Sequence, residues 1–363
     1  MLEAGARWPH QRDLNMQKPA YEIMVGDRAL DFVLPGPDGK FYQFYERTKG
    51  RPLILIFYPG KNSDAWAEVE AFAQRHAEFN DLGIDIFAVN LDTSKDNNKL
   101  DLPFLVWSDL KQKITEHYLN GAGIGLDLRN TINIFLLDAN QRVLNLQTGS
   151  ETGHAARVHE FYQNMPQQPA PQILSANAPV LLLPNLIDPG MCQDLIALWN
   201  EGEHDEGKVV SVVGDEEIAR IHTKVKKRRD HRIMDMDLHK ILQWTIGRRI
   251  APELEKAFHF KGFRFDRFAV VCYDADRGDY FRVHRDNLAP TTADRAFALT
   301  LNLNVEKYEG GELVFPEYGP HKYRPTSGGG ILFSCSLMHE ALPVTRGRRF
   351  ALLSFLRTLD NHG

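Results

Sequence analysis

The chain has 363 residues, of which 43% are hydrophobic and 25% charged, a composition normal for a soluble globular protein. A chain of this length is too long to fold around one ordinary hydrophobic core, so we predict two domains. The net charge of −5 provides no field that would attract nucleic acid or an anionic membrane, so we expect neither partner. No apolar run approaches the roughly 18 residues needed to span a bilayer.

The N-terminal residues and the cysteines favour a cytoplasmic location. The first ten residues include the acid Glu3 and no apolar core, so they do not resemble a secretory signal. Cys192, Cys272 and Cys335 form no Cys-x-x-Cys pair, which fits a reducing compartment. Residues 1–20 show no periodicity, and we predict a mobile N-terminal arm there.

Residues 21–164 alternate strand and helix patterns and form the first predicted domain. Continuous apolar runs indicate strands buried on both faces, and apolar positions at helical spacing indicate a helix. The predicted elements are strands at 52–58 and 84–90, a helix at 63–79, and a hairpin of 131–137 with 143–146. This order of elements predicts an α/β sandwich.

A linker at 165–177 follows, because 165–171 contain three prolines and should be extended. The second predicted domain, 178–363, begins with a helix at 189–201, capped by Asp188, and a helix at 238–258 with a break near Pro252. Short strands separated by turns then predict a β-sandwich or barrel. These strands are 268–273, 296–304, 330–334 and 350–355.

The most informative residues of the second domain are His284, Asp286 and His339. Two residues apart on a strand, His284 and Asp286 would point to the same face. The distant His339 can complete a set of two imidazoles and one carboxylate. This set suits Fe(II), because it leaves coordination positions open for a cosubstrate and dioxygen. A cation just beyond His339 could hold a dicarboxylic acid, and Arg348 and Arg349 follow it.

Four stretches make this domain resemble the prolyl 4-hydroxylase-type 2-oxoglutarate/Fe(II) dioxygenases: 278–286, 301–304, 310–316 and 339–349. The resemblance implies a double-stranded β-helix (jelly roll) with supporting helices. It implies that His284, Asp286 and His339 bind Fe(II) and that 2-oxoglutarate chelates the metal. Asp286 favours hydroxylation, because related halogenases have a small residue at that position.

The implied reaction uses O2 and 2-oxoglutarate to hydroxylate an unactivated C–H bond, with release of succinate and CO2 and with ascorbate as a reductant. The substrate is an amino acid, a peptidyl residue or a small metabolite, and nothing in the sequence selects among these. The alternative is a non-catalytic binding or scaffold protein with relic domains. The complete ligand set argues against that alternative.

The resemblance also suggests a cosubstrate pocket. Arg349, ten residues after His339, matches the family spacing better than Arg348, and only one of two adjacent strand residues can face inward. Tyr273 matches a position at which the family often has a tyrosine near the cosubstrate, although plain packing explains it equally well. Asn302 and Thr300 are further candidates for the same pocket.

A basic run, Lys224–Arg232, contains six cations in nine residues. One interpretation is a solvated loop. The other is a lid that supplies charge to an anionic substrate, with Arg228, Arg229 and Asp230 as the residues to test. The run lacks interleaved aromatic residues, which argues against nucleic-acid binding.

The first domain resembles the thioredoxin-like fold of peroxiredoxins through 25–35, 38–40, 55–59 and 129–138. Ser63 could replace the family's threonine, but Trp66 stands where the family has its reactive cysteine. No cysteine occurs in this half of the chain, which excludes thiol-based peroxidase chemistry. We therefore expect the domain to serve homo-oligomerisation, docking to the oxygenase domain, or binding of a substrate or partner.

Overall fold

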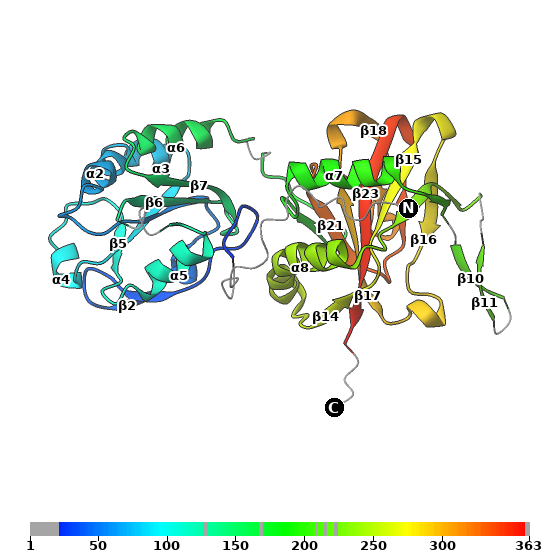
Figure 1. The fold of residues 1–363 in the computed structure, drawn as a ribbon, viewed down its shortest axis with the longest axis horizontal. Helices are drawn as coiled ribbons and strands as arrows, with labels where there is room; N and C mark the ends of the chain where they lie inside the picture. Colours follow the sequence, from blue (N-terminus) through cyan, green and yellow to red (C-terminus); the bar gives the residue numbers. More distant parts are fainter. Residues whose placement is uncertain are drawn as a thin grey trace, which may run out of the picture. The chain divides into compact units, whose positions relative to one another are not determined.

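The computed structural model describes residues 22–125, 130–166, 170–207, 209–213, 216–220 and 224–359, and the predicted arm at 1–20 lies outside them. The chain forms two compact units, residues 1–169 and 170–363. Figure 1 shows their elements in sequence colours. Among the described residues, no helix combines the length and apolarity needed to cross a membrane.

The first unit is built on a five-stranded sheet with the strand order β5-β4-β3-β6-β7. Strands β3 (Leu53–Phe57), β4 (Asp85–Asn90) and β5 (Leu105–Ser108) are parallel. Strands β6 (Ile132–Leu137) and β7 (Val143–Gly149) form an antiparallel hairpin, and β6 also pairs with β3. All of β3 is buried, as its continuous apolar run predicts.

Helices cover both faces of this sheet, so the predicted α/β sandwich is confirmed. One apolar cluster includes Val69, Phe79 and Val158 from three different helices, and the other includes Phe44 and Tyr118. The remaining elements are β1 (Val33–Pro35), β2 (Phe41–Gln43), α1 (Phe44–Arg47), α2 (Trp66–Gln74), α3 (His76–Asp81), α4 (Ser94–Asn97), α5 (Lys113–Gly121) and α6 (His154–Gln163).

The single helix predicted at 63–79 is wrong, because α2 and α3 are separate helices. Arg75 lies between them with φ −95° and ψ 8°, outside the helical region. Phe72 and Phe79, one from each helix, still stack in the same core at 5.8 Å between ring centroids. The apolar residues therefore keep their spacing across the break between the helices. No glycine or proline in the sequence indicates this break.

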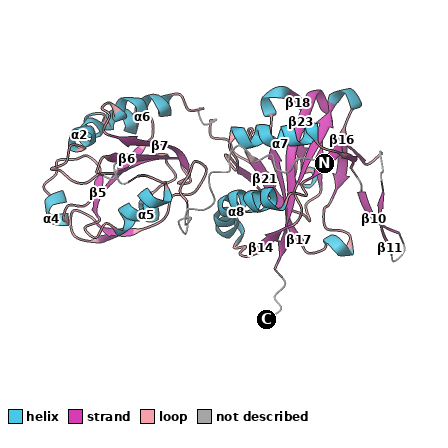
Figure 2. Ribbon diagram, in the orientation of Figure 1, coloured by secondary structure: helices cyan, strands magenta, loops and turns pink. Residues whose placement is uncertain are grey.

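The second unit consists of two antiparallel sheets (Figure 2). The larger sheet has the order β8-β21-β17-β23-β15-β13-β9, with β14 and β18 also paired to β23, and the smaller has the order β12-β16-β22-β19-β20. A separate hairpin pairs β10 with β11. The strands are β8 (Val180–Leu183), β9 (Asp205–Glu206), β10 (Val209–Val213), β11 (Glu216–Arg220), β12 (Lys226–Lys227), β13 (Arg229–Arg232), β14 (Phe263–Phe265), β15 (Ala269–Asp274), β16 (Tyr280–His284), β17 (Arg295–Asn302), β18 (Tyr308–Gly310), β19 (Leu313–Val314), β20 (Lys322–Tyr323), β21 (Gly330–Ser334), β22 (His339–Ala341) and β23 (Val344–Thr358).

Two helices, α7 (Pro189–Glu201) and α8 (Met236–Phe258), lie beside the larger sheet (Figure 1). Trp199 of α7 contacts Phe350 at 5.3 Å between ring centroids, and Phe258 of α8 contacts Phe297 at 5.4 Å. The alternate residues of the same strands, such as Ala351, join an inner apolar cluster. This arrangement confirms the predicted double-stranded β-helix with supporting helices.

The two helices confirm the predicted cap of α7 and contradict the predicted break in α8. Asp188 caps α7 as predicted, since its carboxylate accepts a hydrogen bond from the Met191 amide at 2.9 Å. The break predicted near Pro252 is wrong, because α8 continues through this residue. Ile250 and Leu254 on either side are fully buried, so packing retains the helix despite the missing proline N–H.

Candidate active site

The three predicted metal ligands come together at one end of the smaller sheet. His284 ends β16, His339 begins β22, and the two residues pair across the antiparallel strands. Asp286 lies in a bend beyond β16, so the expectation that one strand carries both His284 and Asp286 is wrong. The Asp286 amide donates to the Cys335 carbonyl at 3.0 Å, which fixes the bend. One ligand atom from each of the three side chains lies within 4.8 Å of the others.

Backbone carbonyls orient both imidazoles. Nδ1 of His284 lies 2.7 Å from the Arg282 carbonyl, and Nδ1 of His339 lies 3.0 Å from the Leu337 carbonyl. A proton on each Nδ1 satisfies these carbonyls and leaves the Nε2 lone pairs for a metal. The Nε2 atoms lie 3.4 and 3.3 Å from the two carboxylate oxygens of Asp286. The donor set and its convergence therefore fit Fe(II).

The electrostatics keep Asp286 in the form that binds metal. Burial opposes its ionisation, but the neighbouring His339 and His284 outweigh burial and hold the pKa of the carboxyl well below its usual range. Burial lowers the pKa of His284. For His339, burial opposes protonation, but Asp286 beside it raises the pKa.

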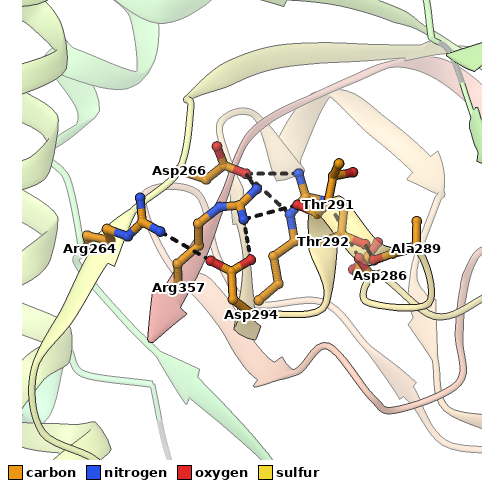
Figure 3. A network of polar contacts seen from close by, with 9 residues as sticks. Arg264, Asp266, Asp286, Ala289, Thr291, Thr292, Asp294 and Arg357 are labelled. Carbon is orange, nitrogen blue, oxygen red and sulfur yellow. Dashed lines mark hydrogen bonds and ion pairs between the residues drawn. The ribbon is translucent and has the colours of Figure 1, made fainter. Parts of the chain in front are cut away.

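A network of polar contacts lies behind Asp286 (Figure 3). Arg295 donates to the Asp286 carbonyl at 3.5 Å and to Asp266 at 2.9 Å. Arg357 donates to Asp266 at 3.1 Å and pairs with Asp294. The network connects the bend that carries Asp286 to the end of β23, so it supports the position of this ligand.

The larger sheet supplies a buried cation to the same pocket. Arg349 on β23 lies opposite Tyr273 on β15 in the strand register, and its side chain is 3% exposed. Arg348 is exposed, and its guanidinium lies over the ring of Phe350 on the other face of the sheet. One nitrogen of Arg349 donates to Asn302 at 3.2 Å. Its Nε has no hydrogen-bond partner among the described residues. A buried donor of this kind fits a carboxylate group of a ligand.

A single pocket contains most of the candidate residues. Besides the three metal ligands, its walls include Arg228, Tyr273, Phe281, Thr300 and Arg349. Asn302 lies behind Arg349 rather than in the wall, and it also donates to the Pro325 carbonyl at 2.9 Å. It can therefore orient the guanidinium of Arg349.

The interpretation of the basic run as a solvated loop is wrong for its central residues. Lys226 and Arg228 are only 6% and 8% exposed. The run contributes β12 to the smaller sheet and β13 to the larger one, and Arg228 lies between these two strands. Arg229 does not share the pocket, because it pairs with Asp274 at 3.2 Å and lies over Trp199.

Sequence reasoning missed Phe281, which stacks on the ring of His284 at 3.5 Å between centroids. The pairing of β16 with β22 shifts register between Phe281 and His284. Simple alternation would place residues three apart on opposite faces, so this irregularity is what brings them together. The signal lies in the strand pairing and not in the local sequence.

The first unit shows what replaces the reactive cysteine of the peroxiredoxin resemblance. Trp66 begins α2, and its ring centroid lies 6.3 Å from that of Tyr58. The Lys61 ammonium lies 5.8 Å from the centroid of the Trp66 ring. The Ser63 hydroxyl donates to the Gly60 carbonyl at 2.6 Å. Trp66, which the resemblance aligns with the nucleophile, is therefore engaged in aromatic packing.

Comparison with known proteins agrees with both resemblances. Residues 268–357 match the family model of the 2OG-Fe(II) oxygenase superfamily, and residues 25–144 match that of the AhpC/TSA family. A PKHD-type hydroxylase of Saccharophagus degradans is 34% identical over 98 residues, covering 25% of this chain and 42% of the relative. A PKHD-type hydroxylase of Psychrobacter sp. is 34% identical over 90 residues, covering 23% and 35%. The chain thus spans less than half the length of these curated relatives.

Some solved structures are also similar to parts of this chain. The viral collagen prolyl hydroxylase of Paramecium bursaria Chlorella virus-1 is 18% identical with a TM-score of 0.37, covering 50% of this chain and 96% of that one. Peroxidoxin BcpB from Mycobacterium tuberculosis is 18% identical with a TM-score of 0.35, covering 40% and 100%. The family models confirm both resemblances: this chain contains an AhpC/TSA family domain followed by a 2OG-Fe(II) oxygenase superfamily domain.

Proposed function

We propose that this protein is an Fe(II)- and 2-oxoglutarate-dependent dioxygenase that hydroxylates an unactivated C–H bond of an amino-acid, peptidyl or small-metabolite substrate. One observation carries the proposal. Three convergent ligand atoms share a pocket with the buried guanidinium of Arg349, whose Nε lacks a partner among the described residues. The similarity to PKHD-type hydroxylases supports the same reaction class.

Each residue of the pocket has a proposed role. His284 and His339 hold the metal through Nε2, and Asp286 holds it through its carboxylate. Bound Fe(II) and 2-oxoglutarate supply the oxidising chemistry, in which one oxygen atom of O2 enters succinate and the other the substrate, with loss of CO2. Arg349 holds the far carboxylate of 2-oxoglutarate, and Asn302 orients Arg349. Tyr273 and Thr300 line the pocket beside them.

Anaerobic titration of the full chain with Fe(II) and then 2-oxoglutarate tests the proposal. A keto acid that chelates Fe(II) gives a weak visible charge-transfer band, and we expect this band only when both components are present. Admission of oxygen should then release succinate. If the band does not form and no succinate appears, the protein is not a 2-oxoglutarate oxygenase.

A further inference from the structure

The structure contains a second buried guanidinium in the pocket, and the proposed binding of Fe(II) and 2-oxoglutarate does not use it. Arg228 lines the pocket, whereas its neighbours in the sequence turn away from it. Lys227 donates to the Arg277 carbonyl, and Arg229 pairs with Asp274. Of the residues in the basic run, Arg228 is therefore the one that lines the pocket.

The strand registers place Arg228 and Arg349 on opposite sides of Tyr273. Tyr273 pairs with Arg349 on β23, and Cys272 pairs with Arg229 on β13. Extending the second register by one residue puts Arg228 beside Tyr273 on the same face. The contact confirms this order, because Arg228 Nη1 donates to the Tyr273 hydroxyl at 2.8 Å. The wall therefore contains a row of two cations with a tyrosine between them.

Asp230 holds the guanidinium of Arg228 in a fixed plane. Its two carboxylate oxygens accept from Arg228 Nε at 2.7 Å and from Nη2 at 3.2 Å. With the bond to Tyr273, these contacts use three of the five N–H groups of an arginine. Lys226 also donates to Asp230, at 3.2 Å, so two cations share this one acid. The arrangement leaves positive charge and oriented donors at the pocket wall, which suits a planar anion.

The position of Arg228 relative to the metal ligands limits how far the anionic group can lie from the reacting C–H bond. The guanidinium carbon of Arg228 lies 5.4 Å from the ring centroid of Phe281, and Phe281 stacks directly on His284. A group held by Arg228 is thus one aromatic ring away from a metal ligand. The anionic group held there and the C–H bond presented to the metal must therefore lie close together in the substrate, as they do in an α-amino acid.

We propose that Arg228, oriented by Asp230 and Tyr273, binds a carboxylate of the substrate, so that the substrate is a small free acid such as an α-amino acid. The carboxylate we assign to this contact is the α-carboxylate, which a residue within a peptide lacks because it is part of the peptide bond. The inference rests on the proposed function, because it assigns the substrate class of the same site.

Matched sets of substrates test the inference on the full chain loaded with Fe(II) and 2-oxoglutarate. One pool contains the common free L-α-amino acids, and the other contains their primary amides. We expect the acids to stimulate succinate release and the amides to give at most about a tenth of this response, because the amides lack the charge that Arg228 binds.

The single variant Arg228→Gln removes the cation, and Asp230 keeps Lys226 as its partner at 3.2 Å, so no acid is left unpaired. It should lower kcat/KM for the active acid roughly 10- to 100-fold, as expected for the loss of a charged hydrogen bond. It should still form the Fe(II)–2-oxoglutarate band at a similar 2-oxoglutarate concentration, which also shows that it is folded. The matched control is Arg232→Gln, an exposed arginine at the end of β13, and should leave all these values unchanged.

Three outcomes would overturn the inference: no response to the acid pool, an equal response to the amides, or a raised 2-oxoglutarate requirement in Arg228→Gln. The last outcome would make Arg228 a cosubstrate anchor. If the unaltered protein gives no Fe(II)–2-oxoglutarate band at all, the proposed function fails, and the inference fails with it.

Discussion

At the scale of single residues, burial distinguishes the two candidate anchors of 2-oxoglutarate. Arg349 lies in the pocket wall, and Arg348 is exposed on the opposite face of β23. We predict that Arg349→Ala raises the 2-oxoglutarate concentration needed for half-maximal band formation roughly 10- to 100-fold, because a charge-assisted pair is lost. Arg348→Ala is the matched control and should change it less than about twofold. The reverse ranking would transfer the role to Arg348.

The metal ligands permit a second residue-scale prediction. His284→Ala should lower Fe(II) affinity by more than roughly 100-fold, since losing even a group that only orients a ligand costs about 10- to 100-fold. The fold should persist, because the side chain lies at the end of β16 and keeps 16% of its surface exposed. Iron content after desalting measures the first effect, and circular dichroism of the metal-free protein measures the second. Unchanged iron content would remove His284 from the site.

At the scale of elements, Asp266 joins β17 and β23 through Arg295 and Arg357. Burial opposes its ionisation, but hydrogen bonds from Arg295 and the charges of both arginines hold the pKa of the Asp266 carboxyl below its usual value. Its contribution to stability is thus fully present above about pH 4, the unfolded value, and is lost as the pH falls through the folded pKa. Asp266→Asn should lower the free energy of unfolding at pH 7 and flatten its decline in acid.

Urea unfolding of the metal-free protein between pH 3 and pH 7 measures this difference. Asp294→Asn offers a comparison from the same network, since Asp294 pairs with Arg357 and Arg264 but not with Arg295. Equal acid dependence in Asp266→Asn and the unaltered protein would show that Asp266 makes no such contribution.

Local patterns in the sequence correctly predicted the elements whose boundaries depend on nearby residues alone. The strand at 330–334 and the helix at 189–201 occur with the predicted boundaries, because their apolar residues and the Asp188 cap are sufficient signals. The bend at Asp286 was not predictable in this way. It depends on a hydrogen bond to Cys335, which is remote in the sequence.

The strands β12 and β13 were missed for a related reason. A run of charged residues gives no apolar alternation, so it resembles a solvated loop. The alternation between buried Lys226 and Arg228 and outward-directed Arg229 arises only when β15 and β16 pair with these strands. Phe281 was missed likewise, because a register shift and not the period of the strand brings it to His284.

At the scale of the whole molecule, the cysteines separate the chemistry of this chain from that of the peroxiredoxins. All three lie in the second unit and are buried. Burial raises the pKa of the Cys192 and Cys272 thiols to about 12 and that of Cys335 further. Thiolates are the reactive form, so native thiols should be inert.

We predict that the native protein at pH 8 shows almost no reaction with a disulfide reagent such as Ellman's reagent, whereas the protein in guanidinium chloride reacts at all three cysteines. The full chain should likewise show no thiol-dependent consumption of hydrogen peroxide. Rapid labelling of a native cysteine would contradict the assignment of these residues as inert.

The division of the pocket between two sheets has a further consequence for motion. His284 and His339 belong to the five-stranded sheet, whereas Arg349 and Tyr273 belong to the nine-stranded sheet. Strand β23 pairs with four other strands, while β22 has three residues. Backbone amides of β22 should therefore exchange with deuterium much faster than those of β23 in the empty protein. A ligand that contacts both sheets would restrict the motion of one sheet relative to the other. Slower deuterium exchange of the β22 amides would then measure ligand binding without any need for turnover.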